Sequence, residues 1–126
     1  MSDHAYEPSK EVIERLKVAH ASRSLHRVDL TSNIDDPIVL IMTGPSSVEY
    51  EKFVEDVQKA SETKGDADRG KALRVAVQNN ALAQIRWPER AEVIALFDKY
   101  PALSLGLAEQ LHATAGASYE VRSRKL

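Results

Sequence analysis

Hydrophobic positions follow helical spacing over most of this chain, with one short exception. Apolar residues recur at intervals of three and four in five separate stretches, which is the pattern of amphipathic α-helices. The exception is Ile38 to Met42, five consecutive apolar residues with a strand's length, preceded by the apolar positions Val28 and Leu30. A strand that is apolar throughout is typical of one covered on both faces, with helices as the candidates. The pattern predicts a mostly helical α+β fold with an N-terminal β-hairpin and about five helices.

Local signals predict where the first elements begin and end. The first helix follows Pro8-Ser9 and ends near His20, and the segment from Asn33 to Pro37 predicts the hairpin turn. Ser46-Ser47-Val48-Glu49 fits a capping box at the start of the second helix. The next segment, 61–70, is polar and predicts a loop or a helix start, and the helix after it is expected to end near Arg86.

Proline and glycine divide the last third of the chain. Pro88 and Pro101 are each predicted to stand in the first turn of a short helix, where the missing N–H of proline would have no partner. Gly116 is predicted to end the second of these helices, and the segment 118–126 to form a last strand or an ordered tail. No internal repeat divides the chain, so one domain over residues 1–126 is expected.

Composition narrows the class of protein only a little. A net charge of −2 and a pI near 6.1 give no electrostatic reason to expect nucleic acid as a partner. The chain has no cysteine, which excludes disulfides and thiolate metal sites and suits a cytoplasmic location. The N-terminus has no apolar signal region, and no run approaches the ~20 apolar residues that cross a bilayer, so no membrane partner is expected.

One segment has the spacing of a phosphate-binding loop. Gly65 to Lys71 matches G-x-x-x-x-G-K, but the next residue is Ala72 where a magnesium-binding Ser or Thr is required. The segment follows a charged helix end rather than a buried strand, and Asp66 and Asp68 would repel phosphate. We interpret it as a helix N-terminus with Asp66 or Asp68 as the cap.

The remaining polar residues predict no catalytic, cofactor or metal site. No two of the four histidines have the i, i+4 spacing of a zinc motif, so they are interpreted as surface or helix-end residues. Asp35-Asp36 is a candidate acidic pair, but a place in the hairpin turn is the favoured interpretation. No serine stands in a G-x-S-x-G elbow. An interaction domain is therefore expected, and not an enzyme.

Four stretches from about Val28 to Leu126 form an ordered set of features. They include an apolar strand followed by a proline, a small polar cap and an aromatic-rich helix, and later an apolar residue followed by a proline. The stretches are Thr43–Phe53, Ile85–Pro88, Phe97–Leu103 and Ala115–Leu126. In this order they resemble one group of phage tail assembly chaperones, small proteins encoded next to the tape-measure gene of phages and prophages.

The resemblance implies a non-enzymatic function in the host cytoplasm. Such a protein would coat the tape-measure protein, keep it soluble before the tail tube polymerises, and help to recruit the tail tube protein. The resemblance also implies a homo-oligomer. A structural tail or head-tail component retained in the particle, or a bacterial adaptor protein, are the alternatives.

Aromatic anchors and a basic chain end are the candidate partner-binding residues. For most of the aromatic residues a place in the core is the favoured alternative, and for the basic end a solvated terminus. The candidates are Tyr50, Phe53, Val57, Trp87, Phe97, Tyr100, Arg122, Arg124 and Lys125.

Overall fold

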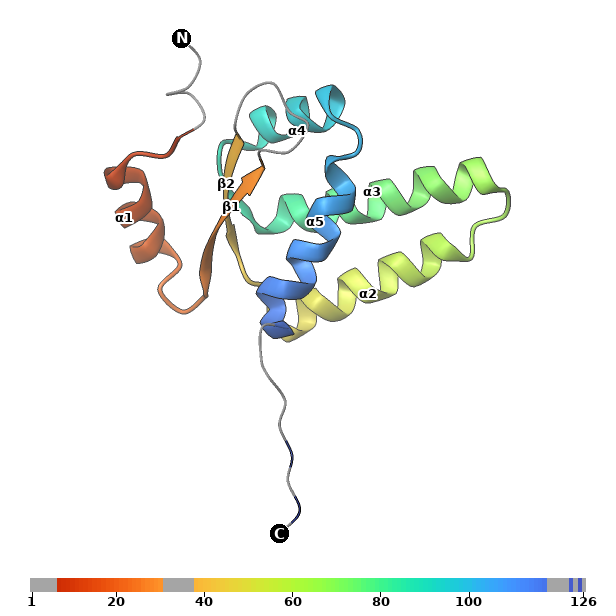
Figure 1. Ribbon diagram of the computed structural model, residues 1–126, viewed down its shortest axis with the longest axis horizontal. Coiled ribbons are helices and arrows are strands. Elements are labelled where there is room, and N and C mark those ends of the chain that lie inside the picture. The colour runs from red at the N-terminus through yellow and green to blue at the C-terminus, as the bar shows by residue number, and fades with distance from the viewer. Residues whose placement is uncertain (1–6, 31–37, 118–122, 124, 126) are drawn as a thin grey trace.

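The computed structural model describes residues 7–30, 38–117, 123 and 125, which form an α+β domain (Figure 1). Five α-helices and a three-stranded antiparallel sheet confirm the predicted fold class. The elements, in chain order, are α1 (Lys10–Ala19), β1 (Leu25–Leu30), β2 (Ile38–Thr43), α2 (Ser47–Ser61), α3 (Asp66–Gln84), β3 (Ile85–Trp87), α4 (Arg90–Lys99), α5 (Leu103–His112) and a short π-type turn, η2 (Ala113–Ala117).

Strand β2 is the middle strand of the sheet. It pairs with β1 from Leu30 opposite Ile38 to Leu25 opposite Thr43, which confirms the N-terminal hairpin. Its other edge pairs with β3, with Ile41 opposite Trp87. The turn predicted between Asn33 and Pro37 lies outside the described residues.

Both faces of β2 are covered, as the unbroken apolar run predicts. All six of its residues are buried. Ile38, Leu40 and Met42 belong to the main hydrophobic core, which the sheet shares with α2, α3, α4 and α5. Val39 and Ile41 belong to a second cluster with Leu16 of α1, Val12, Leu25 and Trp87. Figure 1 shows this division, with α1 on one side of the sheet and the α2–α3 hairpin and α5 on the other.

Strand β3 corrects the predicted end of the third helix. That helix was expected to continue to near Arg86, but it ends at Gln84, and the chain passes directly into the strand. A three-residue strand is too short for its periodicity to show in the sequence, and its pairing partner lies more than forty residues earlier in the chain. The strand therefore depends on tertiary contact rather than on a local signal.

The helix caps confirm some predictions and correct others. The capping box is present: the Glu49 backbone N–H donates to the Ser46 hydroxyl at 3.2 Å, and the Ser46 N–H donates to the Glu49 carboxylate at 2.9 Å. Gly116 has φ 108° just after α5, the left-handed conformation expected of a glycine stop.

Three other caps differ from the predictions. Gly65, with φ 87°, is the cap of α3, and Asp66 and Asp68 lie inside the first turn, where the helix dipole still favours them. Pro88 and Pro101 stand before the caps of α4 and α5 rather than inside the first turns. Pro101 follows α4, which ends there because proline disfavours the helical conformation in the residue before it. Pro88 follows strand β3, and the same restriction allows the extended conformation of Trp87.

Gly44 occupies a position where no side chain fits. Its N–H donates to the Ser24 carbonyl at 3.0 Å. A Cβ atom at this position would overlap with the Thr114 carbonyl oxygen and the Ser24 hydroxyl. The glycine therefore allows the end of the sheet to touch the chain that follows α5.

Gly44→Ala is expected to destabilise the protein. The added methyl group must push the Thr114 backbone away, and such overpacking costs about 1–3 kcal/mol. Gly106→Ala is the matched control, because a Cβ atom there meets nothing within 4 Å and the position is inside α5. It should raise stability by up to about 1 kcal/mol. Thermal unfolding of both variants tests this, and a Gly44→Ala protein that melts at or above the wild-type temperature would contradict it.

Candidate functional site

A polar network joins four elements at one end of the sheet. The Arg23 guanidinium donates to the Gly44 carbonyl at 2.7 Å, to the Glu49 carboxylate at 2.6 Å and to the Gln84 side-chain carbonyl at 2.9 Å. The Thr43 hydroxyl donates to the same Gln84 oxygen at 2.8 Å. Since Thr43 and Gln84 are fully buried, the network extends from the surface into the interior of the protein.

This network holds the fold rather than offering a reactive group. Arg86 adds a hydrogen bond from its Nε to the Thr43 hydroxyl at 3.2 Å, and partial burial and the nearby charge of Arg23 lower the pKa of Arg86. Burial raises the pKa of Glu49, but hydrogen bonds from the Ser46 N–H and from Gln84 outweigh that effect, and the net pKa falls below 4.5. Glu49 is therefore an ionised structural carboxylate at neutral pH. Among the described residues, no group of three His, Cys, Asp or Glu could hold a metal ion.

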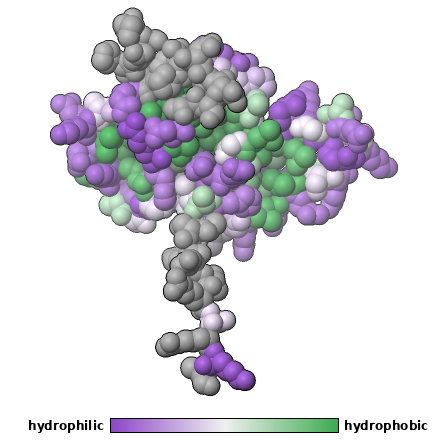
Figure 2. All heavy atoms as spheres, viewed as in Figure 1, coloured by the Kyte–Doolittle hydropathy of each residue, from purple (hydrophilic) through white to green (hydrophobic). Residues whose placement is uncertain are grey.

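A second feature is an apolar groove between α3 and α5, with a volume of about 470 Å³. Leu105 is 74% exposed on its wall although it is a large apolar residue. Figure 2 shows hydrophobic surface over α5 and the adjoining parts of α2 and α3. The groove is lined by Gly70, Leu73, Arg74, Val77, Pro101, Ala102, Ser104, Leu105 and Ala108.

The helix stripes explain why this groove exists. Leu103, Leu107 and Leu111 follow one another at intervals of four and are buried against the core. Leu105 is two residues out of step with that stripe and so points away from the core. The buried Ser104 hydroxyl accepts a hydrogen bond from the Gln78 side chain at 3.1 Å, so the polar atom of the groove floor is already satisfied. Such a surface is suited to apolar contact.

The structure does not gather the predicted partner-binding residues on one surface. Phe53 and Phe97 are only 3% and 6% exposed, which confirms the core alternative for these two. Tyr50, Val57 and Tyr100 are partly buried and pack against the same core.

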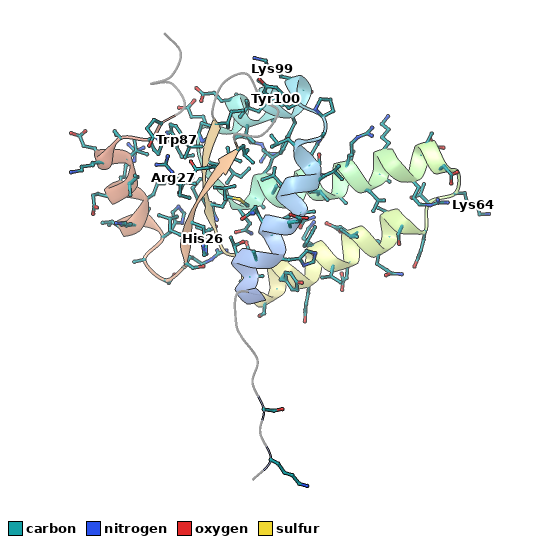
Figure 3. The ribbon with its side chains drawn as sticks, viewed as in Figure 1. His26, Arg27, Lys64, Trp87, Lys99 and Tyr100 are labelled. Carbon is teal, nitrogen blue, oxygen red and sulfur yellow. The ribbon has the colours of Figure 1, made fainter. Side chains whose placement is uncertain are left out.

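The other predicted residues lie in different places. Trp87 packs in the second cluster on the α1 side of the sheet, whereas Tyr100 lies at the end of α4 (Figure 3). Arg122 and Arg124 lie outside the described residues, and Lys125 is exposed.

Sequence reasoning missed the groove residues. The available signal was Leu105, an apolar residue outside the i, i+4 stripe of its helix. In α3 the apolar residues are spread around the helix, with Val75 46% exposed and Val77 only 8% exposed, so no single stripe identifies the residues that line the groove. None of the described helices combines the length and apolar character needed to cross a membrane.

The fold and the groove define a small α+β protein with an apolar hollow between α3 and α5. The chain belongs to the DUF6848 family, a domain of unknown function, whose match spans residues 16–124. A solved structure, an uncharacterised protein rbstp2171 from Bacillus stearothermophilus, is similar, with a TM-score of 0.63 and 16% sequence identity over 89% of this chain and 99% of that chain. At that identity the similarity shows the fold alone. No curated protein matches the chain.

Acidification is expected to weaken the network around Glu49. Because its pKa is lower in the folded than in the unfolded protein, the carboxylate stabilises the fold above about pH 4.5, and this contribution is lost as the pH falls through the folded-state pKa. Glu49→Gln should therefore lower the unfolding free energy at pH 7 and flatten its decline below pH 4.5. Urea unfolding at several pH values measures both effects.

The control for this variant is Glu51→Gln, at an exposed position on the same helix. Part of the acid dependence should persist in Glu49→Gln, because hydrogen bonds from Lys52 and Asn80 also lower the pKa of Asp56. If Glu49→Gln and Glu51→Gln lose stability equally between pH 5 and pH 3, Glu49 does not have the structural role assigned to it.

Proposed function

We propose that this protein is a phage tail assembly chaperone that binds the tape-measure protein in the host cytoplasm and assists assembly of the tail tube, without catalysing a reaction. The observation that carries the proposal is the apolar groove between α3 and α5. It adds to the resemblance of the stretch from Val28 to Leu126, which suggests the particular partner. The family description and the structural neighbour specify no partner.

The groove suits a helical partner. Single exposed apolar residues are common on protein surfaces, but here Leu105 lines a hollow together with Leu73 and Val77 of α3. An amphipathic helix that lays its apolar stripe into such a hollow is a recurrent mode of recognition. A tape-measure protein is expected to be long, helical and apolar, so it needs partners that cover such stripes before assembly.

The groove is also largely preformed. The buried leucines of α5 fix that helix to the core, and the hydrogen bond from Gln78 to Ser104 links α3 to α5 across the floor. A partner would therefore bind without first ordering the surface, which lowers the cost of association.

Co-expression with the product of the adjacent long helical gene tests the function. The wild-type chain should increase the soluble fraction of that product. Leu105→Asp should remove the effect, because it replaces an apolar contact with a carboxylate that would lose its hydration under the partner's apolar stripe. Val48→Asp is the matched control, since Val48 is 73% exposed on α2 and does not line the groove. It should preserve the effect.

Both variants should unfold within about 0.5 kcal/mol of the wild type, since both positions are exposed. If the long helical product is equally insoluble with and without the wild-type chain, the chaperone function is wrong. Recovery of this chain in purified particles would instead support a structural tail component, and a genomic neighbourhood without tube and tape-measure genes would support an adaptor protein.

A further inference from the structure

We infer that the groove between α3 and α5 selects an amphipathic helix whose apolar stripe is flanked by acidic side chains, and that a carboxylate of this helix pairs with Arg74. The inference rests on the proposed function, because it concerns the same groove. It adds the charge of the partner, which the apolar lining alone does not specify.

Arg74 is the source of this selectivity. Among the described residues that line the groove, it alone carries a formal charge. Its side chain is exposed and has no hydrogen-bond or ion-pair partner within the described part of the chain. Arg69, earlier on the same helix, pairs with Asp66 at 2.9 Å, and Arg23 pairs with Glu49 at 2.6 Å. Arg15 and Arg90 resemble Arg74 in having no such partner among the described residues, but neither lines the groove.

The position of Arg74 makes its charge effective. A helix seated in the groove would exclude water from one side of the guanidinium, and an ion pair is stronger at lower local polarity. Electrostatic complementarity of this kind decides which partner is accepted more than it adds affinity. An acidic flank would find a counter-charge, whereas a basic flank would meet a like charge beside an apolar surface.

The groove also has space where a helix backbone must approach. Gly70, one turn before Arg74, lies on the same wall, and an added Cβ atom there meets nothing within 4 Å. Ala108 on α5 and Ala102 at its N-cap add little bulk to the α5 side of the groove. Small residues at a contact allow two helices to pack at short interaxial distance. The space above Gly70 therefore allows the acidic side chains of a partner helix to approach the Arg74 guanidinium.

The direct test uses two synthetic helical peptides with the same leucine stripe, one flanked by glutamates and the other by lysines. Fluorescence anisotropy should show the acidic peptide binding about tenfold more tightly than the basic peptide at low salt. This ratio corresponds to the combined free energies of one attractive exposed ion pair and one repulsive pair of like charges. The ratio should shrink toward one at high salt. Arg74→Glu should reverse the preference, and Arg15→Glu, an exposed charge reversal on α1, should leave it unchanged.

A second pair of variants tests the assignment without removing Arg74. Gly70→Glu places a carboxylate at i, i+4 from Arg74. This carboxylate should form an intramolecular ion pair with the Arg74 guanidinium and so abolish the preference for the acidic peptide. Gly70→Gln has nearly the same size and no charge, and should keep the preference even if both peptides bind more weakly.

The outcomes separate this inference from the proposed function. If both peptides bind equally and Leu105→Asp blocks both, the charge selection is wrong while a helix-binding groove remains. If neither peptide binds the wild-type chain, or if Arg74→Glu leaves the ratio unchanged, the inference is also wrong. The chaperone function is decided independently by the co-expression experiment.

Discussion

The structure depends on the division of β2 between two hydrophobic clusters. Alternate side chains of this strand point to opposite faces, so Leu40 and Met42 enter the main core while Val39 and Ile41 meet α1 and Trp87. A shift of one residue in register would exchange the two sets. The strand end is fixed by the hydrogen bonds of the buried Thr43 hydroxyl with Gln84 and Arg86, which also fix the end of α3.

The groove is a consequence of this anchoring. Since α3 is held at its C-terminal end by Gln84, and α5 packs along its length through a buried leucine stripe, the two helices meet at a defined crossing. Their small facing residues leave space beside that crossing, and Leu105 and Arg74 border it. The groove therefore combines an apolar lining with one charged side chain, Arg74, which has no partner among the described residues. In our account these two properties supply affinity and selectivity respectively.

Local signals in the sequence were sufficient for the fold class and much of the element order. The capping box at Ser46, the unbroken apolar run of β2 and the Gly116 stop each act within a few residues, so each is visible without the fold. Strand β3 was missed because its pairing with β2 is nonlocal. The network around Arg23 was missed because its members come from segments up to 61 residues apart. The groove was missed for the same reason, since it exists only where two helices cross.

Hydrogen–deuterium exchange of the chain, alone and bound to the tape-measure protein, tests the central claim most directly. The amides of α5 around Leu105 and of the N-terminal half of α3 should gain protection on binding, while the exposed side of α1 should remain unchanged. Protection confined to α1 and the sheet face near Trp87, with none on α3 or α5, would contradict the account.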